Sequence, residues 1–212
     1  MSTSTKQEEL ESLRARIEAI ESELASNLRP QAELSRDYPM YYATGGFLLG
    51  LLAATVSLLF NVIGSLIANK DPMELIRIYL TFPLGDKALQ LVEGAGTGKY
   101  AVPDSVILAM GCCLYLGTGM LLGIPVSLAI RKFAGSAGLI ARLITGSVVA
   151  LVIWAVNFYA ILSWLQPALF GGRWITDGTL LPWWVAAATH VVFGATVGAL
   201  YTMIQDRPSA NA

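Results

Sequence analysis

Four long runs of apolar residues divide the charged positions along this chain. No Asp, Glu, Lys or Arg lies between the members of four charged pairs: Asp37 and Lys70, Asp104 and Arg131, Arg142 and Arg173, and Asp177 and Asp206. Each run exceeds the about 20 residues that a helix needs to cross a membrane, and none alternates as the strands of a membrane barrel do. The pattern therefore predicts an all-α transmembrane bundle. The expected spans are residues 42–68, 105–130, 139–164 and 181–204.

Composition supports the membrane assignment and narrows the range of partners. Hydrophobic residues make up 55% of the 212 positions and charged residues 14%, whereas soluble domains carry about 25% charged residues. The net charge of −1 gives no reason to expect a nucleic-acid partner. The first forty residues lack the apolar core and cleavage site of a secretory signal, so we expect the N-terminus to be retained.

The distribution of Lys and Arg predicts the orientation of the chain. Five precede the first span, four lie in the first loop, three flank the second loop, and the third loop and the tail carry one each. The side that holds the N-terminus therefore carries nine of the fourteen, which the positive-inside rule assigns to the cytoplasm. We expect both termini to be cytoplasmic, in a membrane of the bacterial inner-membrane type. The third loop has the Trp residues of an aromatic belt: Trp164, Trp174, Trp183 and Trp184.

Residues 1–29 predict a separate cytoplasmic helix with an apolar seam. Glu9 and Arg14, which flank this seam, have the opposite signs that a parallel assembly of identical chains needs. The heptad spacing is typical of a coiled coil, but it also suits a helix packed on another protein or on the chain's own cytoplasmic loop. Residues 8–27 thus predict a contact within a homo-oligomer or with other subunits of a membrane complex. The seam consists of Leu10, Leu13, Ile17, Ile20 and Leu24.

The first loop predicts one further helix, over residues 72–82. Asp71 and Glu74 form a capping box, and Pro72 suits the first helical position. Its apolar and polar residues fall on different faces, which favours a helix lying in the membrane interface. The apolar face holds Met73, Ile76, Tyr79 and Leu80, and the polar positions are Glu74, Arg77 and Thr81. The expected division of the whole chain is an N-terminal helix, a linker, the bundle and a tail, at residues 1–29, 30–41, 42–204 and 205–212.

Two short motifs resemble functional sites but lack the residues that such sites need. The stretch GAGTGKY has Glu93 where a phosphate-binding loop needs Gly and Tyr100 where it needs Ser or Thr. It therefore predicts a glycine turn, and we expect no nucleotide. Cys112 and Cys113 are adjacent on a helix and point in different directions, so they cannot hold one metal ion together.

Three of the spans carry glycine pairs at four-residue spacing. This spacing makes a flat strip along which two helix backbones can approach closely, which drives packing in lipid. The strips suit packing within one chain, and they also suit a dimer face. The packing glycines are Gly46 and Gly50, Gly119 and Gly123, and Gly194 and Gly198, with the looser pair Gly146 and Ala150 in the third span.

Three polar side chains are predicted to lie at one depth in the bundle. His190, the only histidine, lies seven residues inside Trp183, and Asn157 lies seven residues inside Trp164. At 1.5 Å per residue both are about 10 Å below the same surface, and Asn61 in the first span falls at a similar depth. Such residues form either a hydrogen-bonded cluster that holds the helices together or a ligand or proton-relay site for a quinone-like molecule or a lipid headgroup.

The sequence predicts architecture in more detail than activity. The charge-free runs offer no acid or base to activate a nucleophile, and one histidine cannot ligate a haem twice, so we expect no catalytic residues, no metal and no resident cofactor, although a bound lipid or quinone fits the polar layer. The leading hypothesis is a non-catalytic accessory or assembly subunit of an inner-membrane complex. The alternative is a homo-oligomeric channel or small-solute transporter lined by Asn61, Asn157 and His190.

Overall fold

The computed structural model describes residues 9, 11–24, 39–67, 71–90 and 104–205, and it is helical throughout these ranges, with turns between the helices and no strand. Four helices are long and apolar enough to cross a membrane: Met40–Ile67, Ser105–Ala134, Leu139–Phe170 and Trp183–Met203. The prediction of an all-α protein with four spans is therefore confirmed. The chain divides into two compact units, Met1–Tyr41 and Tyr42–Ala212.

The first two spans are α-helical throughout, whereas the last two change from one type of helix to another. The first is α2 (Pro39–Ile67) and the second is α5 (Asp104–Ala134). The third begins as α6 (Leu139–Ala155), widens into the π-helical segment η1 (Val156–Leu162) and continues as α7 (Ser163–Phe170). The fourth is α8 (Trp183–Leu200), which ends in the 3₁₀ turn η2 (Tyr201–Met203). The third span is six residues longer than predicted, because α7 extends it past Trp164.

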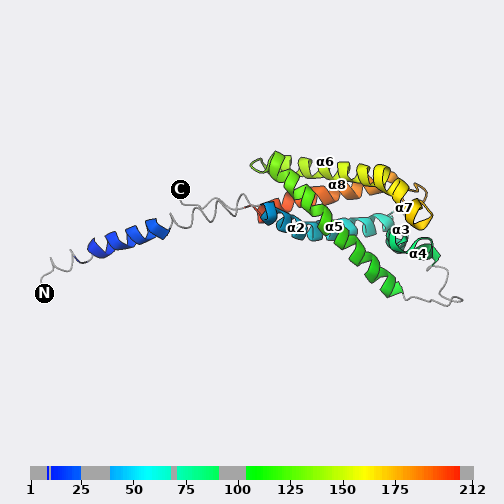
Figure 1. The fold of residues 1–212 in the computed structure, drawn as a ribbon, viewed down its shortest axis with the longest axis horizontal. Coiled ribbons are helices and arrows are strands. Elements are labelled where there is room, and N and C mark those ends of the chain that lie inside the picture. The colour runs from blue at the N-terminus through cyan, green and yellow to red at the C-terminus, as the bar shows by residue number, and fades with distance from the viewer. Residues whose placement is uncertain (1–8, 10, 25–38, 68–70, 91–103, 206–212) are drawn as a thin grey trace. The chain divides into compact units, whose positions relative to one another are not determined.

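The small-residue strips bring the spans together in pairs. A Cβ atom on Gly123 of α5 would lie only 2.5 Å from the Cα atom of Gly50 in α2, so the two backbones touch there. In the same way, a Cβ on Gly194 of α8 would lie 2.8 Å from the Ala150 side chain of α6. Figure 1 shows α6 and α8 running side by side, while α5 diverges from them toward its Asp104 end. The glycines therefore pack against other helices of the same chain. Between α2 and α5 the contact joins Gly46 and Gly50 to Gly119 and Gly123. Between α6 and α8, Gly146 contacts Gly194, and Gly198 contacts the backbone of Arg142.

Two positive residues of the second loop lie against the ends of the spans. Arg142 falls inside the predicted third span, and its side chain is buried. Its Nη1 donates a hydrogen bond of 3.0 Å to Gln205 Oε1, and Gln205 Nε2 donates one of 2.8 Å to the Gly135 carbonyl. The Arg131 guanidinium lies 4.2 Å from the centre of the Tyr42 ring. The two Gln205 hydrogen bonds join the end of the fourth span to the second loop, and the Arg131 contact joins the second span to the first.

Helix α3 (Pro72–Leu84) forms where the capping box predicts it and is followed by the short α4 (Lys87–Gln90). Its polar positions are covered by protein as well as its apolar ones: Arg77 is buried and pairs with Asp71 at 3.0 Å, and Thr81 is fully buried. The turn between α3 and α4 uses the positive φ of Gly85, 63°, which glycine adopts without strain. The position of α3 in the membrane interface stays a prediction, and the burial of both faces indicates that the helix packs as part of the bundle.

The N-terminal unit contains a helix over residues 11–24. Four seam residues that the structure describes are all exposed, with exposed fractions of 51 to 63%: Leu13, Ile17, Ile20 and Leu24. Leu10 of the seam lies outside the described residues, as do most of the predicted linker, the GAGTGKY stretch and nearly all of the tail. In the described part of this chain, no other segment covers the apolar stripe of this helix. The coiled coil stays a prediction.

Candidate site: a polar cavity within the bundle

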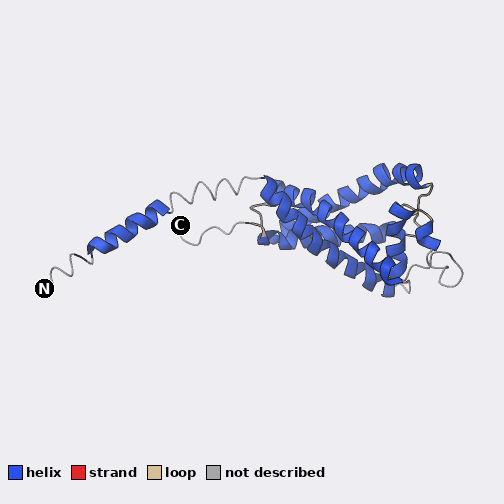
Figure 2. Ribbon diagram, turned by 60° about the horizontal axis from the view of Figure 1, so that its bottom comes forward, coloured by secondary structure: helices blue, strands red, loops and turns tan. Residues whose placement is uncertain are grey.

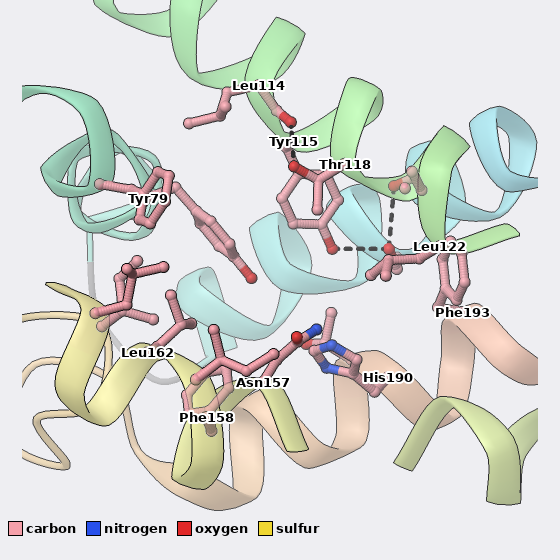
Figure 3. A pocket seen from close by; sticks show the side chains of 18 residues that line it. Tyr79, Leu114, Tyr115, Thr118, Leu122, Asn157, Phe158, Leu162, His190 and Phe193 are labelled. Atoms are coloured by element: carbon pink, nitrogen blue, oxygen red, sulfur yellow. Dashed lines mark hydrogen bonds between the residues drawn. The ribbon is translucent and has the colours of Figure 1, made fainter. Parts of the chain in front are cut away.

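A cavity of about 340 Å³ lies among the spans (Figure 3). Six elements contribute to its wall: α2, α3, α5, η1, α7 and α8. Aromatic residues close it on several sides, since Tyr79, Phe158 and Phe193 all line it. Figure 2, in which the bundle is turned by 60°, shows how these helices are arranged, and Ile175 of the loop between α7 and α8 adds to the wall. The cavity is therefore an intramembrane space with mostly apolar walls and a few polar groups.

His190 of α8 lines the cavity and is half-buried. Its Nδ1 lies 2.8 Å from the carbonyl oxygen of Ala186, one helical turn earlier. A carbonyl can only accept a hydrogen bond, so Nδ1 carries the proton, and in the neutral ring Nε2 is an acceptor. The backbone thus fixes both the tautomer and the orientation of the imidazole.

Asn157 lines the cavity from the π-helical segment η1. Figure 3 shows its amide pointing toward the His190 ring, so the structure brings together these two residues of the predicted polar layer. Within the described ranges, the Asn157 amide makes no hydrogen bond to another residue. Segments of π-helix inside α-helices are frequent at functional sites because they turn side chains out of register. Here the wide turn presents an amide to the cavity.

Asn61 of α2 does not line this cavity. It is buried and accepts a 2.7 Å hydrogen bond from the Thr189 hydroxyl of α8. Its Nδ2 also donates to the Tyr115 hydroxyl of α5, at 3.5 Å. Tyr115 Oη in turn lies 2.7 Å from Ser57 Oγ, which can donate to the Ala54 carbonyl at 3.1 Å. The result is a hydrogen-bonded chain that joins α8, α2 and α5, and three of its members, Ser57, Tyr115 and Thr189, form part of the cavity wall.

The directions of donation in this chain are mutually consistent. If Ser57 donates to the α2 backbone, then Tyr115 donates to Ser57, and the Tyr115 oxygen is free to accept from Asn61. The Ser57 and Tyr115 protons then have one acceptor each, and both ends of the Asn61 amide are used. The single Thr189 proton is shared between Asn61 Oδ1 and the Val185 carbonyl, at 2.7 and 2.8 Å. In a low-dielectric interior such a satisfied network is rigid. Asn61 therefore acts as a structural connector and not as a cavity residue.

The polar layer of the sequence analysis is thus divided in two. Asn157 and His190 face the large cavity, and Asn61 lies in the hydrogen-bonded chain and lines a smaller cavity of about 80 Å³. Thr189 connects the two parts, because it neighbours His190 in the chain and donates to Asn61. The three residues are close in the fold but have different surroundings.

Sequence reasoning missed several polar residues of this region. Ser57 and Ser65 lie four residues before and after the predicted Asn61 on α2, and all three are buried. That spacing was a readable signal for a polar stripe facing the bundle. Tyr79 and Tyr115 carried no such signal, because their ring contact, with centres 5.1 Å apart, joins α3 to α5 across the fold. Burial raises the pKa of the Tyr79 phenol, with a further contribution from Tyr115, so Tyr79 is a neutral wall residue.

A second buried polar contact holds α3 against α7. Gln166 is fully buried, its Nε2 donates to the Thr81 hydroxyl at 3.1 Å, and its Oε1 accepts from the Ile175 amide at 3.0 Å. In the loop that follows, Thr179 donates its hydroxyl and its amide to Asp177 Oδ1 at 2.7 and 2.8 Å. These two hydrogen bonds lower the pKa of the Asp177 carboxyl. The third loop is therefore ordered by local hydrogen bonds.

The chemistry that the cavity can perform is hydrogen bonding to an uncharged group. No Asp, Glu, Lys or Arg of the described ranges lines it. Among the residues that the structure describes, no three His, Cys, Asp or Glu side chains converge as a metal site would need. Cys112 is half-buried, Cys113 is exposed, and both are free thiols outside the cavity wall. The cavity thus offers the imidazole acceptor of His190, the amide of Asn157 and the hydroxyl of Tyr79.

Comparisons with protein-family models, with curated proteins and with solved structures found no match for this chain.

Proposed function

We propose that this protein is a non-catalytic accessory or assembly subunit of a larger complex in a bacterial-type inner membrane. In this proposal both termini are cytoplasmic, and the N-terminal helix is the contact through which the protein self-associates or binds another subunit. The transmembrane bundle anchors and positions that helix. Neither nucleic acid nor a nucleotide has a part in this function.

The observation that carries the proposal is the exposed apolar stripe of the N-terminal helix. Four residues of the stripe are more than half exposed: Leu13, Ile17, Ile20 and Leu24. Full burial of one such side chain under a partner stabilises the complex by on the order of 1.5–3 kcal/mol. A helix of this length is marginal alone in water. Anchoring several copies in one membrane raises their effective concentration, which favours association.

The transporter alternative has less support from the positions of its proposed lining residues. Asn61 is hydrogen-bonded on both sides of its amide and lines a different cavity from Asn157 and His190. The three residues therefore do not line one path. Solute flux into liposomes, compared between the wild type and His190→Ala, tests this alternative. A flux that falls in the variant would favour transport over the accessory function.

The experiment that tests the accessory function measures the mass of the full chain in a mild detergent. The variant Ile17→Glu with Leu24→Glu places charge in the stripe, and Glu18→Gln with Ser22→Ala, on the same helix but outside the stripe, is the matched control. We expect the wild type and the control to purify as oligomers or with a co-purifying membrane subunit, and the stripe variant as a monomer alone. A wild type that is monomeric and alone, or a stripe variant with unchanged mass, would refute the proposal.

A further inference from the structure

Among the polar groups that line the large cavity, His190 and Asn157 lie beside each other, and the described part of the chain shows no hydrogen-bond partner for His190 Nε2 or for the Asn157 amide. His190 uses Nδ1 on the Ala186 carbonyl, at 2.8 Å, which leaves Nε2 as an acceptor. The Asn157 amide, beside it in Figure 3, has both a donor and an acceptor to offer. Asn157 and His190 are both half-buried, and a polar group that faces a mostly apolar space without a partner costs up to about 1–3 kcal/mol in proteins. The pair therefore indicates that a polar group from outside the chain belongs between them.

The size of the cavity restricts what that group belongs to. Its volume of about 340 Å³ is roughly twice that of the engineered cavity that takes up one benzene molecule, about 150 Å³. It is also at the lower end of the range of ligand pockets, about 300–1,000 Å³. One substituted ring or two fused rings fit this volume, and the walls formed by Tyr79, Phe158 and Phe193 suit a flat aromatic face.

The surroundings of the cavity indicate how such a molecule would enter. Two of the lining residues, Thr118 of α5 and Ile161 of η1, are also exposed. They belong to the two helices that diverge in Figure 1, and both lie within segments that are apolar enough to span a membrane. The opening therefore faces lipid, and a ligand with an apolar tail can enter sideways while its tail stays among the acyl chains.

The charge of the ligand follows from the wall. The described lining residues include no Asp, Glu, Lys or Arg, and an isolated charge in such a space has a large desolvation cost. The His190 acceptor selects a hydroxyl donor over a bare carbonyl. The ligand is thus neutral, ring-headed and hydroxyl-bearing.

We propose that this cavity is a binding site for a lipid-soluble molecule with a hydroxylated ring as its head, a quinol being the simplest example, with one hydroxyl donating to His190 Nε2 and Asn157 bonding the same head. The site is independent of the N-terminal helix and of the association proposed above.

A series of three ligands of one shape tests the hydrogen bonds. Duroquinol carries two ring hydroxyls, duroquinone has two carbonyls in their place, and durene has neither. Binding to the full chain in detergent is measured by calorimetry under argon. We expect duroquinol to bind in a saturable way and more tightly than the other two, by about fivefold for each net hydrogen bond. Equal affinity for all three, or no saturable binding of duroquinol, would overturn the proposal.

Three variants connect the binding to the cavity. Asn157→Leu and His190→Phe keep the approximate volume and remove the polar atoms, so each should weaken duroquinol binding about fivefold and leave durene unchanged. The matched control is Thr196→Val, because Thr196 lies on the same helix as His190, bonds only to the Val192 carbonyl and does not line the cavity. If His190→Phe fails to fold, Asn157→Leu alone decides. Unchanged duroquinol affinity in the folded variants would refute the site.

The natural source of the ligand is identified by extraction. Lipids that co-purify with the wild type and with Asn157→Leu are compared by mass spectrometry. An isoprenoid quinol or another ring-headed alcohol that is retained by the wild type and depleted at least severalfold in the variant supports the proposal. Selective retention of acyl-chain alcohols such as diacylglycerol, with no ring-headed lipid, would contradict it.

Discussion

Asn61 and Asn157 have the same side chain in the same bundle, yet their surroundings differ completely. Asn61 lies on the regular helix α2, which the glycine contact holds close to α5, so its amide reaches both Tyr115 and Thr189. Asn157 lies on the π-helical segment η1, where α5 has diverged, and its amide faces a cavity. The comparison shows that backbone approach decides whether a polar side chain in a span stabilises the fold or is left available for a ligand.

We expect the largest loss of stability when the glycine contact between α2 and α5 is disrupted. In Gly123→Leu the new side chain would overlap the Gly50 backbone, and overpacking of this kind costs about 1–3 kcal/mol or more. We expect a large fall in the unfolding free energy in detergent, together with loss of the Asn61 to Tyr115 hydrogen bond. Gly117→Leu, on the same helix with nothing within 4 Å of its Cβ position, is the control. Equal tolerance at both positions would show that the close approach is not what holds α2 to α5.

Replacing each asparagine by leucine tests the contrast directly. Asn61→Leu removes two hydrogen bonds, one from Thr189 and one to Tyr115, while these hydroxyls keep the Val185 carbonyl and Ser57 as partners. It should lower the unfolding free energy by about 0.5–1.5 kcal/mol for each hydrogen bond lost. Asn157→Leu removes an amide that has no partner in the described part of the chain, and should leave the stability unchanged or raise it. Thermal unfolding of both variants in one detergent measures the difference. A loss at Asn157 as large as that at Asn61 would mean that Asn157 is a structural residue.

The smallest effect is expected in the third loop, where the polar groups are paired but exposed. The hydrogen bonds from Thr179 lower the pKa of Asp177 in the folded chain. Their stabilisation is therefore present above the usual carboxyl pKa of about 3.9 and is lost as the pH falls through the folded value. We expect the wild type to melt slightly above Thr179→Ala at pH 7, and the difference to shrink and vanish as the pH falls below the usual carboxyl value and Asp177 becomes protonated in the folded chain. If the difference in melting temperature does not change with pH, the stabilisation comes from packing of the threonine and not from the hydrogen bonds to Asp177.

Much of this molecule was predictable from spacing along the chain. The charge-free runs predicted four spans, the capping box at Asp71 and Glu74 predicted α3, and the four-residue spacing of glycine marked the strips that pack. These features are local: each depends on which residues share one helix face or one helical length. The surroundings of Asn157 were not predictable in this way, because no periodic signal distinguishes VNFYAIL from the α-helix before it.

What the sequence by itself determined is the class of the protein and the composition of each helix: apolar spans of sufficient length, small residues where backbones can meet, and an amphipathic N-terminal helix. Only the tertiary structure decided which polar residues are partners. It linked Asn61 to Thr189 and Tyr115, residues far apart in the chain, and it left Asn157 and His190 facing a cavity. The physical reason is that a hydrogen bond in a membrane needs two atoms within about 3 Å, and that distance is set by how the helices cross.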